Sequence, residues 1–371
     1  MRLIFIVLSQ FLSGSIWFAG NVAFMGQGFL LSAVQLGFII GTLGFAFLNI
    51  SDRFSPARVF FLSAAMGSLF NTAGIFVGNS MGLVLASRVL CGISLAGIYP
   101  VGMKIAVSWY PKSVSRALGW MVGALVLASG FPYLILALSW KGDPGVILAA
   151  TSLLCLSGGL IQLFLVGDGP YLPKSSPFSP GVVIDIFRHP EFRRSAFGYF
   201  GHMWELYAVY AYIPLMIEEI GSQHAELWSF GFFAAGFLGC AAGGVAALRI
   251  GSRRIAMAAL AFSGTICVLS PLLPILPQDM AKAVVLIWGL SAAADSPQFS
   301  SLNTRFAPPN YVGSALTIVN CIGFLITIVT IELLDVWIRS LGIRTAFLIL
   351  ALGPLFGLVS LKSLQEEHPV A

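Results

Sequence analysis

The chain has 371 residues, of which 58% are hydrophobic and 9% are charged, and its formal net charge at pH 7 is +5. Soluble domains carry about 25% charged residues, so this composition excludes a soluble enzyme or binding domain. The mean hydropathy of +0.92 predicts an integral membrane protein, in which the positions of the basic residues matter more than the net charge.

Apolar stretches follow one another along the chain, each long enough to cross a hydrocarbon core about 30 Å thick. They predict an all-α integral membrane fold with twelve spans. The first stretch is too long for the apolar part of a signal peptide, so we expect it to be an uncleaved helix. The spans are expected at residues 3–25, 30–50, 57–78, 82–107, 113–138, 144–167, 195–217, 226–248, 254–276, 280–303, 311–333 and 344–362.

Basic residues gather on one side of these spans. The other side would hold only Lys141, Lys282, Arg339 and Arg344, and Arg88 would lie within the fourth span. Because short cytoplasmic loops collect lysine and arginine, this pattern predicts that both termini are cytoplasmic. The basic residues expected on the cytoplasmic side are Arg2, Arg53, Arg58, Lys104, Lys112, Arg116, Lys174, Arg188, Arg193, Arg194, Arg249, Arg253, Arg254, Arg305 and Lys362.

The sequence indicates no cofactor or metal. All five cysteines fall within expected spans and none forms a C-x-x-C pair, so we expect neither a disulfide nor a zinc site. The pattern G-x-x-x-x-G-K-[ST], which would indicate an ATP-driven pump, does not occur.

A proline-rich and basic segment, residues 167–194, follows the sixth expected span. We interpret it as a cytoplasmic linker between an N-terminal six-helix bundle, 1–166, and a C-terminal six-helix bundle, 195–371. Paired halves are a common plan among transporters. A short internal match supports a duplication, because Arg53 in the loop after the second span corresponds to Arg249 after the eighth span, 196 residues later.

The loop after the second span, "LNISDRFSPAR", resembles the signature of the major facilitator superfamily, G-x-L-x-D-R-x-G-R-R. Asp52 and Arg53 stand at its D-R, and Arg58 lies one place from its last basic position. Leu48 and Ser55 replace the two glycines of the signature. The segment "RVLCG", residues 88–92, also resembles an R-x-x-x-G element of that superfamily. The resemblance implies two six-helix bundles that transport a solute by alternating access.

The resemblance also implies a conformational latch that ties the two halves together in one state. Its members here would be Asp52, Arg53, Arg58 and Arg249. The alternative is that these arginines only set the topology, because short cytoplasmic turns are basic in any membrane protein. That alternative does not explain Asp52.

Three further segments, "GHMWELYA" (201–208), "ADSPQFSSL" (294–302) and "GSALTIVNCIGF" (313–324), resemble bacterial permeases loosely grouped with nitrate and cyanate transporters. This likeness implies a small anionic or polar solute and a bacterial inner (plasma) membrane.

Five ionisable residues fall within expected spans: Arg88, Lys104, His202, Glu205 and Asp295. A charge at mid-bilayer costs about 3 kcal/mol, so each needs a partner, a cavity or a function. All five lie in the fourth, seventh and tenth spans, which line the central cavity in the superfamily. Lys104 is expected nearer the cytoplasmic interface, where extension of its side chain toward water would explain it.

We predict that Glu205 and Asp295 handle protons in a water-filled cavity between the halves, because a carboxyl group shielded from water holds its proton more tightly than one in solution. His202 and Glu205 are three residues apart and share a helix face. Pro297 should loosen the helix around Asp295. The alternatives are a static pair that fixes packing, or a metal site made from the H-x-x-E spacing.

The expected solute site combines a polar stripe on the first span with groups on the fourth, seventh and tenth. Arg88 could bind an anion with its guanidinium fork, or it could serve proton coupling or packing. The predicted substrate-binding residues are Gln10, Trp17, Asn21, Arg88, Tyr99, His202, Tyr212 and Gln298.

The sequence therefore favours a secondary active transporter of a small anionic or polar solute, coupled to protons, that works as a monomer and binds no nucleic acid. Proton-driven export of drugs or metabolites is the alternative, and a metal-ion transporter or a non-transporting sensor is less favoured. We expect no cytoplasmic output segment, which a sensor often has, because the last span ends near residue 362. No nucleophile with a base, and hence no enzyme, is indicated.

Overall fold

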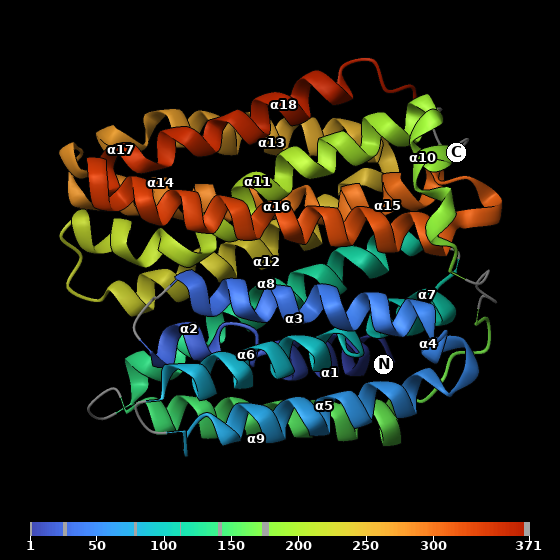
Figure 1. Ribbon diagram of the computed structural model, residues 1–371. Coiled ribbons are helices and arrows are strands. Elements are labelled where there is room, and N and C mark those ends of the chain that lie inside the picture. Colours follow the sequence, from blue (N-terminus) through green and yellow to red (C-terminus); the bar gives the residue numbers. More distant parts are fainter. Residues whose placement is uncertain are drawn as a thin grey trace.

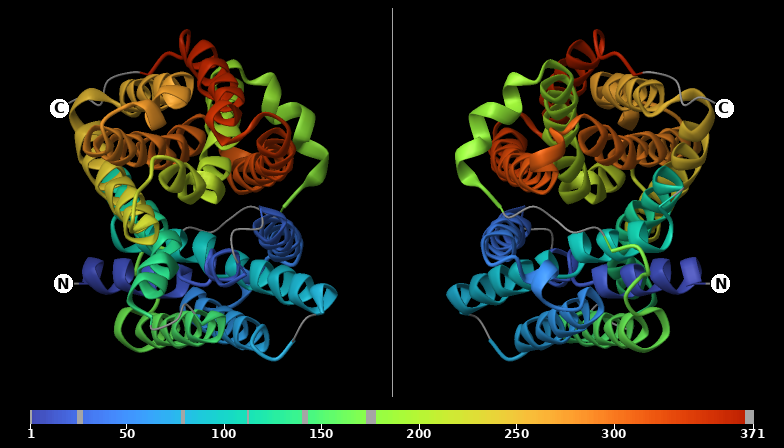
Figure 2. Two further views of the ribbon diagram at one scale, coloured as in Figure 1. Left: turned by 90° about the vertical axis from the view of Figure 1, so that its left-hand side faces the viewer. Right: turned by 90° about the vertical axis from the view of Figure 1, so that its right-hand side faces the viewer.

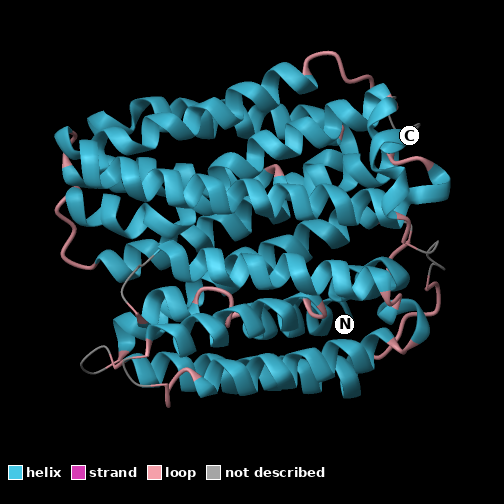
Figure 3. Ribbon diagram, in the orientation of Figure 1, coloured by secondary structure: helices cyan, strands magenta, loops and turns pink. Residues whose placement is uncertain are grey.

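The computed structural model describes residues 2–24, 28–77, 80–111, 113–139, 143–172 and 178–366. Lys112, Lys141 and Lys174 of the expected basic pattern lie outside these residues. Within the described ranges the chain is helical and contains no strand (Figure 3). This follows from the long apolar stretches, because a backbone inside lipid must satisfy its own hydrogen bonds and a helix does so within one segment.

The helices gather in two bundles, stacked one above the other in Figure 1 and seen end-on in Figure 2. The first bundle consists of α1 (Arg2–Gly14), α2 (Ala19–Ala23), α3 (Gly28–Phe47), α4 (Ile50–Arg53), α5 (Pro56–Ala73), α6 (Met81–Ala96), α7 (Tyr99–Trp109), α8 (Val114–Leu138), α9 (Pro144–Ile161) and η1 (Gln162–Val166).

The segment that joins the bundles carries η2 (Pro180–Val182) and α10 (Val183–Arg188). The second bundle consists of α11 (Pro190–Glu219), α12 (Ala225–Ile250), α13 (Ser252–Leu269), η3 (Ser270–Ile275), α14 (Gln278–Ala294), α15 (Ser296–Phe306), η4 (Pro309–Tyr311), α16 (Val312–Leu341), α17 (Ile343–Ala346), η5 (Phe347–Ala351) and α18 (Leu352–Leu361). We call the end of the molecule that carries α10 the linker end.

Eight helical segments of the described ranges are long and apolar enough to cross a membrane. They correspond to the second, fourth, fifth, sixth, eighth, ninth, eleventh and twelfth expected spans. The other four expected spans are matched by α1 with α2, by α5, by α11 and by α14 with α15. The arrangement is consistent with twelve spans, and the domain boundaries stay a prediction.

The tenth expected span is broken at Asp295, which separates α14 from α15. Pro297 explains the break, because proline has no N–H and its ring clashes with the carbonyl group four residues before it. That carbonyl belongs to Ala293, and it accepts a hydrogen bond from the Cys240 thiol at 3.0 Å. The expectation that Pro297 loosens the helix around the acid is therefore confirmed.

Most of the contact between the bundles is made by two pairs of helices, α8 with α12 and α3 with α16. Between α8 and α12 the backbones approach closely at Gly119 and Gly244, where an added Cβ on Gly244 would lie 3.0 Å from the Gly119 Cα. Small residues allow such close contacts between membrane helices. At the end away from the linker, the Ser32 hydroxyl of α3 donates to Glu332 of α16 at 2.7 Å.

Aromatic rings fill the space between the bundles midway along the helices. The Trp17 ring, in the turn between α1 and α2, stacks with Tyr207 of α11 and Phe324 of α16 at centroid distances of 6.0 and 5.8 Å. Phe18 stacks with Tyr207 at 6.3 Å. Because all these rings are buried, they close the contact between the halves at this level.

Candidate functional site

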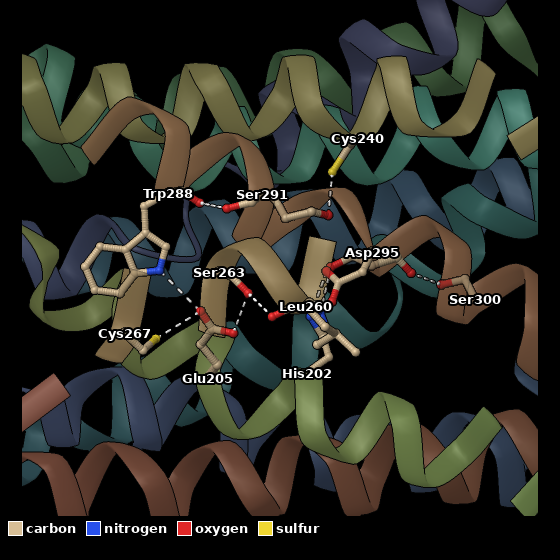
Figure 4. Close-up of polar contacts among 12 residues, drawn as sticks. His202, Glu205, Cys240, Leu260, Ser263, Cys267, Trp288, Ser291, Asp295 and Ser300 are labelled. Atoms are coloured by element: carbon tan, nitrogen blue, oxygen red, sulfur yellow. Dashed lines mark hydrogen bonds and ion pairs between the residues drawn. The ribbon is translucent and has the colours of Figure 1, made fainter. Parts of the chain in front are cut away.

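His202 and Asp295 lie side by side in the interior of the second bundle. His202 Nδ1 of α11 is 2.9 Å from Asp295 Oδ1, at the break between α14 and α15, and both side chains are almost completely buried. His202 Nε2 lies 2.8 Å from the Ser296 hydroxyl oxygen. The imidazole thus connects the carboxyl group to a serine that is only half-buried. Figure 4 shows His202 beside Asp295.

Glu205 lies one turn further along α11, and its carboxyl group points in a different direction, into the space between α11, α13 and α14. Its Oε1 accepts from the Trp288 indole at 3.2 Å and from the Cys267 thiol at 3.3 Å. Its Oε2 accepts from the Ser263 hydroxyl at 3.0 Å. All the partners belong to the second bundle, so Glu205 does not face the first bundle as we had expected from sequence.

The reason is helical geometry. Residues three apart on a helix differ by about 60° around the axis, so they share a broad face but need not point at the same neighbour. His202 meets the break at Asp295, whereas Glu205 meets α13 and α14. Because their side chains diverge, His202 and Glu205 do not come together as a metal site with the H-x-x-E spacing would require. Within the described residues, no group of three or more His, Cys, Asp and Glu side chains could hold a metal ion.

Both buried acids have neighbours that can adjust to a change of one proton. A serine hydroxyl can donate or accept a hydrogen bond. Ser296 can donate to a neutral His202 or accept from a doubly protonated one. The Ser263 hydroxyl lies 3.0 Å from Glu205 Oε2 and 3.4 Å from the Leu260 carbonyl oxygen. It can therefore turn to Leu260 and accept from Glu205 once that carboxyl group is protonated.

Arg88 lies in the interior of the first bundle and is completely buried. Its Nη1 donates to Asn71 Oδ1 at 2.8 Å and its Nε to the Ser87 hydroxyl at 3.3 Å. A Cβ on Gly20 would lie 2.5 Å from the Arg88 Cδ, so the absence of a side chain there makes room for the arginine. Among the described residues Arg88 has no acidic partner, and its Nη2 is buried without a hydrogen bond.

Most of the other predicted substrate residues are buried polar groups with unpaired atoms. Buried polar atoms are usually hydrogen-bonded, so such a group needs an explanation. The polar side-chain atoms of Gln10, Asn21 and Gln298, the Trp17 indole nitrogen and the Tyr212 hydroxyl have no hydrogen-bond partner among the described residues. Tyr99 is half-buried, and its ring lies 6.4 Å from that of Trp17.

These residues do not form one cluster. The Gln10 amide packs against Gly102 of α7, and the Gln298 amide against Gly243 of α12. The Tyr212 hydroxyl lies beside Gly28 at the start of α3, near the end away from the linker. Since α1 ends at Gly14 and α2 begins at Ala19, the polar stripe expected on the first span is not one continuous helix face.

At the linker end, Asp52 forms an ion pair with Lys104 of α7 at 2.5 Å. Both belong to the first bundle, and Lys104 also donates to the Ser51 carbonyl oxygen. Arg53, Arg58 and Arg249 are exposed and have no ion pair within the described part of the chain. The structure therefore gives Asp52 a partner within its own half, and the latch between the halves stays a prediction.

Sequence reasoning missed the residues that surround the two acids and Arg88. Ser263, Cys267 and Trp288 hold Glu205, and Asn71 holds Arg88. One signal was available, because Asn71 and Cys267 are 196 residues apart, the same offset as the loop repeat. Each stands at an equivalent place in its half and contacts that half's buried ionisable side chain.

A family model described as the Major Facilitator Superfamily matches residues 3–331. The chain belongs to the Major Facilitator Superfamily. A Haemophilus influenzae protein named "Putative metabolite transport protein" is 30% identical over 121 residues, which are 31% of this chain and 29% of that protein. The chain thus matches less than a third of the length of this curated relative.

Among solved structures, the crystal structure of the human organic anion transporter MFSD10 (TETRAN) resembles the chain with a TM-score of 0.74 and 15% identity, over 97% of this chain and 99% of that one. At this identity the likeness shows the fold alone. Together with the family model it confirms the fold class and the resemblance to the major facilitator superfamily.

Membership in the superfamily also decides how to interpret the serine, histidine and aspartate at the break. Ser296, His202 and Asp295 stand in the order of a hydrolase triad. A Major Facilitator Superfamily protein is a membrane-embedded transporter of small molecules and not an enzyme. The contacts that run from Asp295 through His202 to Ser296 are therefore available for moving or holding a proton.

Proposed function

We propose that the protein is a proton-coupled secondary transporter of a small anionic or polar metabolite that works by alternating access. The observation that carries this proposal is the buried contact between His202 and Asp295, which continues to the half-buried Ser296. A buried ionisable pair inside a transporter needs a function because of its desolvation cost. Loading and releasing a proton is such a function, because the Ser296 hydroxyl can donate to a neutral His202 or accept from a doubly protonated one.

Asp295 is the better candidate for the coupling acid, and Glu205 is the second. Asp295 lies where the helix is broken, so a small change at the break would move the carboxyl group relative to His202. Glu205 accepts from three donors on two neighbouring helices and can also serve as a fixed anion that holds α11 against α13 and α14. The two roles lead to different results when each acid is replaced.

The substrate class rests on two kinds of support. The names of the similar proteins, a metabolite transport protein and an organic anion transporter, suggest a metabolite or an organic anion. Arg88 offers a buried positive charge without an acidic partner among the described residues, and an anion would compensate it. The aromatic rings around Trp17 would favour a solute with a flat apolar part.

We further propose that the protein acts as a monomer in a bacterial inner membrane with both termini in the cytoplasm. The orientation follows from the basic residues at the linker end, since short cytoplasmic loops collect lysine and arginine. Most of the expected cytoplasmic arginines, such as Arg53, Arg58 and Arg249, are exposed there.

The experiment that tests coupling measures flux in proteoliposomes with purified protein, an imposed pH gradient and candidate organic anions. Wild type, Asp295→Asn and Glu205→Gln are compared with Asp279→Asn, a matched control whose carboxylate is fully exposed. We expect Asp295→Asn to lose gradient-driven accumulation and to keep counterflow exchange, while Asp279→Asn behaves as wild type. Full gradient-driven accumulation by Asp295→Asn would disprove its role in coupling.

The same assay separates uptake from export, which is the second candidate function. A symporter accumulates solute on the side to which protons flow, whereas an antiporter accumulates it on the opposite side. If Glu205→Gln loses gradient-driven accumulation and Asp295→Asn does not, Glu205 and not Asp295 is the coupling acid. If wild type moves none of the anions but a cationic or neutral compound instead, the anionic substrate class is wrong.

A further inference from the structure

A groove on the side of the molecule runs between α1, α8 and α12 and has a volume of about 500 Å³. It is lined by apolar side chains of α1 from Leu3 to Phe11, by one face of α8 and by Phe237 of α12. Figure 2 shows the start of α1 at the edge of the first bundle, on the side where α8 and α12 meet. The groove therefore lies across the boundary between the bundles.

One charged side chain lines this groove. Arg116 stands near the start of α8 at the linker end, and the groove continues along the same helix face past Trp120 to Leu127. The distance from Arg116 to Leu127 along α8 is about 16 Å, which is close to the depth of one leaflet of a hydrocarbon core about 30 Å thick. The groove is therefore long enough to hold one acyl chain, and a cation stands at its outer end.

The cation at this end is available to a ligand. Arg116 is exposed and has no ion pair or side-chain hydrogen bond within the described residues. A second cation stands at the same end, because Arg2 directly precedes the groove residue Leu3 and its guanidinium lies 4.0 Å from the centre of the Trp109 ring. Two arginines beside an apolar groove complement an anionic head group and not a neutral one.

We infer that this groove binds an anionic phospholipid, with the phosphate at Arg116 and one acyl chain along α1, α8 and α12. The site is separate from the buried acids and does not depend on the proposed proton coupling. Its inner wall is part of the contact between the bundles, since an added Cβ on Gly123 of α8 would lie 3.0 Å from the Phe237 ring. A bound lipid would therefore touch both halves of the transporter.

Trp120 provides the test, because it lines the groove and its fluorescence is quenched by bromine atoms on a nearby acyl chain. The purified protein is reconstituted with rising fractions of brominated phosphatidylglycerol or brominated phosphatidylcholine. The signal of Trp120 is the difference between wild type and Trp120→Phe, which removes the contribution of the other seven of the eight tryptophans. The variants Arg116→Gln and Ala124→Leu are compared with Arg188→Gln, an exposed arginine of α10 outside the groove.

We expect half-maximal quenching of Trp120 at an about fivefold lower fraction of phosphatidylglycerol than of phosphatidylcholine, the scale for one basic side chain at an anionic lipid. Arg116→Gln should remove this preference and Arg188→Gln should keep it. Ala124→Leu narrows the groove and should weaken quenching by both lipids. Equal quenching by both lipids in wild type, an unchanged preference in Arg116→Gln, or no quenching of Trp120 would each overturn the inference.

Discussion

The thiol of Cys240 on α12 donates a hydrogen bond to the carbonyl oxygen of Ala293, which cannot receive the usual bond from four residues later because Pro297 has no N–H. The break in the tenth span is thus supported from a neighbouring helix. The break places Asp295 between two helical segments, with its side chain against His202. The cysteine therefore acts on the site through the backbone and touches neither ionisable group.

Removing this thiol should loosen the break. Cys240→Val cannot donate to Ala293, whose carbonyl would then keep only the backbone N–H at the C-cap of α14, and the loss of one buried hydrogen bond costs about 0.5–1.5 kcal/mol. We expect a lower thermal unfolding midpoint for Cys240→Val in detergent, and a smaller loss for Cys240→Ser, which keeps a donor. Equal midpoints for Cys240→Val and wild type would show that the helix break does not depend on this bond.

Gly20 should tolerate no side chain because of Arg88. An added Cβ would lie 2.5 Å from the Arg88 Cδ and 2.8 Å from its Nη1, and the arginine is completely buried. Forcing extra atoms into such a site costs about 1–3 kcal/mol. We expect Gly20→Ala to lower the unfolding midpoint and to impair flux.

Gly44 of α3 is the matched control for this substitution, because a Cβ there would meet nothing within 4 Å. Gly44→Ala should leave the unfolding midpoint unchanged or raise it slightly, as expected for alanine in a helix. The packing argument fails if the two substitutions have the same effect.

The contact between Ser32 and Glu332 should open during transport. It connects α3 and α16 at the end away from the linker, where the Thr327 hydroxyl also donates to Gln35 at 2.6 Å. In alternating access the two ends open in turn, so a covalent bridge here should stop flux. The test is the pair Ser32→Cys and Glu332→Cys, treated with a short reducible crosslinker, in a background that replaces the partly exposed Cys321.

We expect crosslinking of the double variant to abolish exchange and a reductant to restore it. Each single variant, treated in the same way, controls for modification of one cysteine. Undiminished exchange in a fully crosslinked sample would show that this end does not need to separate.

Ser263 should matter to Glu205 through its hydroxyl group. Ser263→Ala removes the group that can donate to the carboxylate and accept from the protonated form. If Glu205 changes its protonation during transport, gradient-driven flux should fall while counterflow exchange is kept. If Glu205 is a fixed anion, both fluxes should fall together with the unfolding midpoint, because the loss of one donor weakens the contact between α11 and α13.

Much of the fold could be predicted from sequence because apolar length is a strong signal in membrane proteins. The break at Asp295 could be predicted as well, since Pro297 acts through local backbone chemistry. The resemblance put His202 and Asp295 on two spans that line one cavity, and the structure places these two side chains in contact. The length of a span and the place of its break depend on one helix alone.

The parts that could not be predicted depend on rotation of one helix against another. The direction of Glu205 is set by how α11 packs against α13 and α14, and a difference of about 60° decides which neighbour it meets. The partner of Asp52 was missed for a similar reason, because Lys104 lies 52 residues later in the sequence and no local pattern joins them. The groove beside α1 likewise exists only once three helices are placed.

The glycine contact between α8 and α12 bears on how the two bundles can move. Interlocked side chains would have to disengage before one helix turned against the other, and each disengagement would add to an activation barrier. At Gly119 and Gly244 the helices instead meet along bare backbone. If one bundle rocks on the other, this level of the contact needs no side chain to repack, whereas ring contacts further along the same helices, such as that of Tyr133 with Phe233, would have to shift.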